Sequence, residues 1–118
     1  MILKILTKML EKLDYSAIPA SNGVEAIDLV RSLKIQHKKI EFAILDINVP
    51  GEYNGIETLS RLRDIDPNLL AIASSGYSND ELFSKPEKYG FNVILPKPYT
   101  AKELKSAIGQ ILQLKRKL

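Results

Sequence analysis

The chain has 118 residues, of which 45% are hydrophobic, and a formal net charge of +3 at pH 7. This length fits one globular domain with a proper hydrophobic core, so we expect a single domain over residues 1–118. Because there is no cysteine and one histidine, disulfides, zinc–thiolate clusters and thiol nucleophiles are excluded, and a metal site would depend on oxygen ligands.

The first thirteen residues predict an amphipathic helix. Apolar side chains recur there at helical spacing, and Lys4 and Lys8 interrupt the apolar run. These lysines, together with the lack of a small-residue cleavage site after them, argue against a signal peptide or a membrane span. We therefore expect a cytoplasmic protein that has no membrane partner.

Strand-like and helix-like segments then alternate along the middle of the chain. We expect strands at 16–20, 42–47 and 69–73, and helices at 22–33 and 56–63. Ser21 or Asn22 can cap the first of these two helices. His37 and the lysines after it read as a solvated connection, because one histidine cannot build a metal site and no aromatic residues accompany the charges. We expect no nucleic-acid binding.

The last third of the chain continues the alternation. We expect a short helix at 80–89, with Pro86 as a local irregularity and Gly90 as its terminator, and a last strand at 91–95. Thr100 and Glu103 have the spacing of a capping box, which predicts that the final helix begins at Thr100.

Apolar strands separated by helices predict a doubly wound α/β domain, in which a parallel sheet carries helices on both faces. Functional sites in such sheets lie beyond the carboxyl ends of the strands. Asp46, Ser74, Ser75 and Lys97 stand at such ends. A carboxylate there can attack a phosphoryl group while a hydroxyl and an ammonium hold its oxygens. The alternative is a plain Asp46–Lys97 salt bridge, with Ser75 capping a helix.

Four segments carry a resemblance to a known family: ASNGVEAIDLV, LDINVPGEYNG, SSGYSND and LPKPYTAKEL, in this order. Together they resemble the receiver domain of two-component response regulators. The resemblance implies the flavodoxin-like strand order 2-1-3-4-5. It also implies that Asp46 is the phosphoryl acceptor, that Ser75 is the switch hydroxyl, that Lys97 contacts the phosphate, and that the peptide bond before Pro98 is cis.

The chain departs from that family at its start. A receiver begins with an apolar strand ending in acidic residues that hold magnesium, whereas this sequence begins within the first helix. We expect an N-terminally truncated receiver fold without its first strand, in which magnesium would keep the Asp46 carboxylate and the Asn48 backbone carbonyl. Loss of a central strand opens a sheet edge, so we expect a homo-oligomer. Ile94 stands where many receivers carry a switch aromatic.

Two functions remain open at this point. In the first, the chain is a receiver in a phosphorelay, not an enzyme, and Asp46 accepts a phosphoryl group from a histidine kinase or phosphotransfer protein. In the second, it is a phosphorylation-independent interaction or oligomerisation module. A small-molecule enzyme on this scaffold is disfavoured, because no dinucleotide-binding glycine pattern follows a strand. Tyr77 and Tyr99 are interpreted as packing or partner-surface residues.

Overall fold

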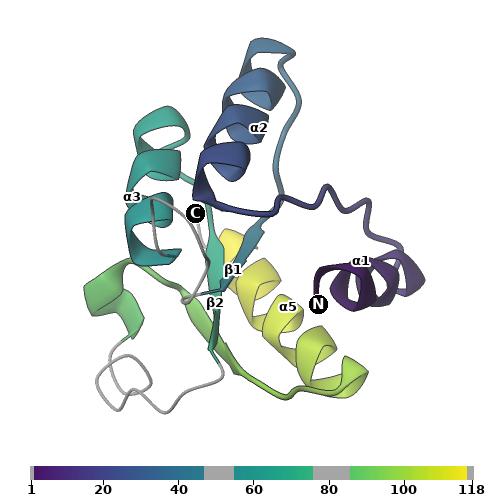
Figure 1. Ribbon diagram of the computed structural model, residues 1–118. Coiled ribbons are helices and arrows are strands. Elements are labelled where there is room, and N and C mark those ends of the chain that lie inside the picture. The colour runs from purple at the N-terminus through teal and green to yellow at the C-terminus, as the bar shows by residue number, and fades with distance from the viewer. Residues whose placement is uncertain (1, 47–54, 76–85, 117–118) are drawn as a thin grey trace.

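In the described residues, two helices come first, helices then alternate with three strands, and these three strands are parallel. The computed structural model in Figure 1 describes residues 2–46, 55–75 and 86–116. Its strands are β1 (Ala43–Asp46), β2 (Ala71–Ser75) and β3 (Val93–Pro96). Its helices are α1 (Ile2–Lys12), α2 (Gly23–Ile35), α3 (Gly55–Ile65), the 3-10 helix η1 (Pro86–Tyr89) and α5 (Ala101–Arg116).

The three strands form one parallel sheet in the order β1-β2-β3. Its register sets Asp46 of β1 opposite Ser74 of β2, and Ser74 opposite Leu95 of β3. The carboxyl ends of all three strands therefore meet at one edge of the sheet. The prediction of a parallel α/β sheet is confirmed.

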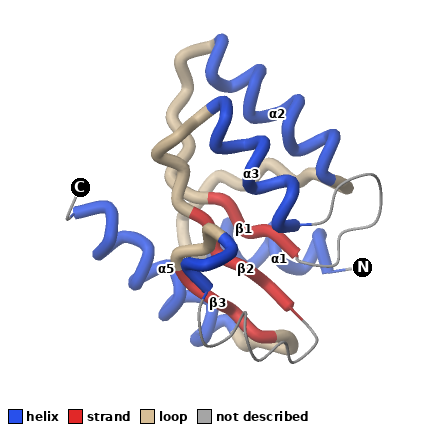
Figure 2. Tube along the Cα trace, turned by 90° about the vertical axis from the view of Figure 1, so that its left-hand side faces the viewer, coloured by secondary structure: helices blue, strands red, loops and turns tan. Residues whose placement is uncertain are grey.

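Helices cover both faces of the sheet, as Figures 1 and 2 show. Side chains alternate along β2, so Ala71 and Ala73 pack with α2 and α3, and Ile72 packs with α5. Helix α1 contributes Leu10 to the core on the α5 side. The doubly wound layering expected from the apolar strands is thus confirmed.

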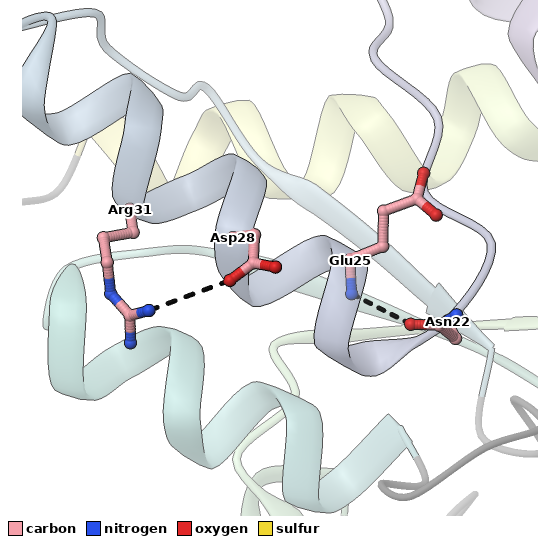
Figure 3. Close-up of polar contacts among 4 residues, drawn as sticks. All are labelled: Asn22, Glu25, Asp28 and Arg31. Atoms are coloured by element: carbon pink, nitrogen blue, oxygen red, sulfur yellow. Dashed lines mark hydrogen bonds and ion pairs between the residues drawn. The ribbon is translucent and has the colours of Figure 1, made fainter.

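The ends of the helices agree with the sequence signals. Asn22 caps α2, since its Oδ1 accepts a hydrogen bond of 2.9 Å from the Glu25 backbone N–H (Figure 3). At α5, the Thr100 N–H donates to Glu103 Oε1 at 3.1 Å and the Glu103 N–H donates to Thr100 Oγ1 at 3.2 Å. The predicted capping box is therefore confirmed, and it fixes the start of α5 directly after the turn that follows β3.

One predicted element differs from the structure, and another lies largely outside the described residues. Residues 16–20 form no strand, because a strand needs a neighbour for its backbone hydrogen bonds and none of the three described strands pairs with them. Pro19 also lacks a backbone N–H for a ladder. Of the helix predicted at 80–89, the structure describes the single 3-10 turn η1, with Pro86 as its first residue; the preceding residues, 76–85, lie outside the described ranges.

Candidate functional site

The carboxyl edge of the sheet holds an ion pair that spans the middle strand. Asp46 is the last residue of β1 and Lys97 follows directly on β3. Lys97 Nζ donates a hydrogen bond to Asp46 Oδ2. The Lys97 side chain is 17% exposed and that of Asp46 is 38% exposed. The ammonium is thus largely covered by protein, whereas the carboxylate remains open to a reactant from solvent.

Lys97 owes its position to the elements on either side of it. β3 brings the chain to the edge of the sheet, and the Lys97–Pro98 peptide bond is cis, as the family resemblance implied. The capping box at Thr100, three residues after Lys97, then starts α5 at Ala101. The lysine is therefore held between a strand and a capped helix.

The two serines at the end of β2 differ in what the structure describes. Ser74 lies opposite Asp46 and is buried, with 3% of its surface exposed. Its Oγ has no hydrogen-bond partner among the described residues. Ser75 lies opposite Pro96, and its side chain is outside the described part of the structure, as are Asn48 and Tyr77.

Tyr99 lies near this edge. The sequence analysis interpreted it as a packing or partner-surface residue. Its ring is half-buried against the core on the α5 side. Burial raises the pKa of the Tyr99 hydroxyl, the negative charge of Asp46 raises it further, and the Ser74 hydroxyl lowers it. A polar residue at the core-facing position 74 is the sequence signal that could have drawn attention to Tyr99.

The described residues do not complete a magnesium site. Among them there is no group of three or more His, Cys, Asp or Glu side chains that could hold a metal ion. The Oδ2 oxygen of Asp46 is occupied by Lys97. Magnesium requires near-octahedral oxygen coordination, so Asp46 with the groups described around it does not fit the ion, and Asn48 lies outside the described ranges.

Two grooves on the surface involve none of the residues of this edge. One, of about 310 Å³, lies between α2 and α3, and Figure 3 shows the pair Asp28–Arg31, at 3.8 Å, that belongs to its lining. The other, of about 280 Å³, lies at the end of α2 beside Lys38 and Asp66.

Within the residues described, no helix has both the length and the apolar character needed to cross a membrane.

Comparison with known proteins shows which family and which folds the chain resembles. The family model of the response regulator receiver domain matches residues 1–109. The sporulation initiation phosphotransferase F of Bacillus subtilis is 28% identical over 111 residues, which cover 94% of this chain and 85% of the relative. A CheY-like receiver domain protein of Methanospirillum hungatei has a TM-score of 0.82 at 22% identity, covering 98% of this chain and 88% of that one. A response regulator protein of Burkholderia pseudomallei, described with a phosphorylated aspartic acid, calcium ion and citrate, has a TM-score of 0.74 at 23% identity, covering 97% of this chain and 64% of that one.

Proposed function

The chain belongs to the response regulator receiver domain family and is a receiver of two-component signalling, and on that premise we propose that it accepts a phosphoryl group on Asp46. Receiver domains in general work with a histidine kinase or a phosphotransfer protein. They are acceptors of the phosphoryl group, not enzymes with a substrate of their own.

The observation that carries the proposal is the contact between Lys97 and Asp46 at the carboxyl edge of the sheet. A carboxylate with more than a third of its surface exposed can meet a phosphoryl donor from another protein. The ammonium beside it can neutralise the negative charge of the incoming phosphoryl oxygens. The Burkholderia relative has a phosphorylated aspartic acid on the same fold, which supports the same chemistry here.

In the proposed reaction a carboxylate oxygen of Asp46 forms a bond to the phosphorus atom of a phosphohistidine on the partner. The phosphorus–nitrogen bond breaks at the same time, and the leaving imidazole takes up a proton from water. Lys97 then holds an oxygen of the resulting acyl phosphate. The protein contributes position and charge, which supply most of the catalysis in phosphoryl transfer. Ser75 is proposed as the second contact to the phosphoryl oxygens.

Receiver domains typically bind magnesium, which neutralises charge during the transfer. In the part of the chain that the structure describes, no group of three or more His, Cys, Asp or Glu side chains could hold that ion. A magnesium ion at Asp46 would then take its remaining ligands from outside the described residues, Asn48 among them. Phosphoryl uptake by the chain alone is accordingly expected to be slow.

Intact mass measurement tests the proposal. The purified chain is incubated with acetyl phosphate, with and without magnesium, beside the Asp46→Asn variant. The parent is expected to gain the mass of one phosphoryl group, and the variant is expected to gain none, since an amide is not a nucleophile toward phosphorus. Equal gain by both proteins, or no gain by a folded parent, would contradict the assignment of Asp46.

A second function, a phosphorylation-independent interaction module, is favoured by the incomplete acidic group around Asp46 in the described residues. Binding to a captured cytoplasmic partner separates the two functions. A phosphorylation switch changes its affinity for the partner when a phosphoryl donor is added, and Asp46→Asn removes this response. A constitutive module binds equally well in both proteins, with and without the donor.

A further inference from the structure

The groove at the end of α2 gathers positive charge. It has a volume of about 280 Å³ and lies where the end of α2 meets the residue that follows α3. Its charged and titratable lining consists of three lysines, one histidine and one carboxylate: Lys34, His37, Lys38, Lys39 and Asp66. With the histidine neutral, three positive charges accompany one negative charge. Repulsion among like charges this close is relieved when negative charge binds beside them.

The backbone holds this cluster in place. His37 ends α2 with φ of +58°, and its N–H donates to the Lys34 carbonyl at 3.0 Å. The Lys38 N–H donates to the Leu33 carbonyl at 2.9 Å. These two hydrogen bonds form a Schellman motif, which is a defined helix end. Lys34 Nζ donates in addition to the carbonyl of Ile65, the last residue of α3. The end of α2 is thus fixed to the end of α3.

Two lysines of the groove are available to a partner. The side chains of Lys38 and Lys39 are exposed and form no ion pair with another residue in the described ranges. Val30, which is buried, and Ile40, which is half-buried, give the same groove an apolar surface. A ligand that matches this lining carries negative charge beside an apolar group.

The groove lies at the edge of the sheet opposite Asp46. The loop after α2 leads into the start of β1, and Asp66 follows α3 on the way to the start of β2 (Figure 2). Because β1 and β2 are parallel, their amino ends meet at one edge, and Asp46 stands at the other. A protein bound in the groove would therefore leave the Asp46 carboxylate open to a phosphoryl donor.

We propose that the groove is a docking site for a partner protein, which binds through an acidic segment that contains an apolar side chain. Carboxylates of the segment pair with Lys38 and Lys39. Its apolar side chain packs on Val30 and Ile40. A nucleic acid fits less well, because unpaired bases bind by stacking on aromatic side chains and the lining residues described include none. This docking does not depend on the phosphoryl acceptance proposed above.

Fluorescence anisotropy tests the proposal with a short labelled peptide in which leucines alternate with pairs of glutamates. The whole chain is titrated into the peptide at physiological salt, where long-range attraction is screened, and saturable binding is expected. Lys38→Gln/Lys39→Gln should bind at least about tenfold more weakly, because both pairing charges are lost. Asp66→Asn should bind about threefold more tightly, because it removes the negative charge of the described lining.

Lys102→Gln/Lys105→Gln is the matched control, because it removes the same charge from exposed lysines of α5. It should change the affinity by less than about twofold. A peptide with serine in place of each leucine should bind more weakly than the leucine peptide. Equal weakening in the two double variants, or equal binding of the two peptides, would overturn the proposal. So would the absence of saturable binding, or tighter binding of a single-stranded oligonucleotide of the same charge.

The same proteins separate this proposal from the proposed function. Lys38→Gln/Lys39→Gln should take up a phosphoryl group as fast as the parent, since both lysines lie at the opposite edge of the sheet from Asp46. A parent that binds the peptide but takes up no phosphoryl group would defeat the function proposed above and support the docking site. A parent that takes up the phosphoryl group but does not bind the peptide would do the reverse.

Discussion

At the scale of single residues, the pair Asp46–Lys97 is hard to explain by stability alone. An ion pair whose carboxylate is 38% exposed is screened by water and contributes little to folding. Its position at the carboxyl edge of a parallel sheet is where such folds place their chemistry. The pair is better explained by a chemical role, in which the charges of Asp46 and Lys97 take part in a reaction.

Replacement of Lys97 by Met separates these two explanations. We expect the free energy of unfolding to change by less than about 1 kcal/mol, since the pair is partly exposed. Phosphoryl uptake, in contrast, should fall by about a hundredfold, because one positioned charge at the developing negative charge is lost. Denaturant titration gives the first quantity and intact mass against time gives the second. A large loss of stability with uptake unchanged would show that the pair is structural.

The pKa of Tyr99 provides a probe of the charge on Asp46. Burial and the Asp46 carboxylate both raise this pKa above the ordinary value of 10.0, so Asp46→Asn should lower it while burial keeps it above that value. NMR titration of tyrosine ring carbons, with Tyr99→Phe to assign the signal, measures it. Because the folded state holds the proton more tightly, the contribution to stability is complete below pH 10 and is lost as the pH rises further. A Tyr99 pKa that is the same in parent and Asp46→Asn would contradict this coupling.

At the scale of elements, an arginine joins the end of α3 to the segment before β3. Arg63 Nε donates to the Leu69 carbonyl at 3.1 Å, Nη2 donates to Asn92 Oδ1 at 3.0 Å, and Nη1 donates to the Gly90 carbonyl. Asn92 in turn accepts from the Ala71 N–H at 2.9 Å. These contacts fix where β2 and β3 begin, and hence where Lys97 arrives at the opposite edge.

Substitution at Gly90 tests this connection. Gly90 has φ of +90°, and an added Cβ would lie 2.9 Å from Arg63 Nη1 and 3.3 Å from Leu59 Cδ2. Gly90→Ala should therefore cost about 1–2 kcal/mol of unfolding free energy. Gly109→Ala is the matched control, since an added Cβ in α5 meets nothing within 4 Å, and it should stabilise by about 0.5–1 kcal/mol. Denaturant titration compares the two, and equal effects would contradict the account.

Most helices and strands could be predicted from the sequence, because the signals that predict them are local. Three signals depend on residues within one or two helical turns: the apolar face of α1, the N-cap residue Asn22 of α2, and the capping box at Thr100. The strand predicted at 16–20 failed because pairing depends on a neighbour that is remote in sequence. For the site, the rule that functional residues lie at the carboxyl ends of parallel strands correctly predicted that Asp46 and Lys97 lie at the same edge of the sheet. The packing of Tyr99 against the core on the α5 side depends on residues remote in sequence, which no local pattern contains.

At the scale of the whole molecule, the sheet has an open edge along β1 in the described residues. The Ala43 N–H donates to the carbonyl of Leu70, directly before β2, so alternation turns the N–H group of Ile44 to the other side. None of the described strands pairs there. Backbone groups at an open edge favour pairing with another chain.

We therefore expect the chain to self-associate. Light scattering over a dilution series would then give an average molar mass that falls toward the monomer mass as the protein is diluted. Ile35→Ser is the control: Ile35 is 73% exposed on α2, away from β1, and its loss should leave the association unchanged. A stable monomer at every accessible concentration would contradict the expectation.

The central claim is that Asp46 carries the phosphoryl group, and trapping of the acyl phosphate tests it most directly. Borohydride reduces an acyl phosphate at its carbonyl carbon and converts that aspartate to homoserine, which peptide mass spectrometry can locate. After treatment with acetyl phosphate we expect homoserine at position 46 and at no other aspartate. A folded chain whose Asp46 stays unmodified, or whose trapped residue is a different aspartate, would contradict the account.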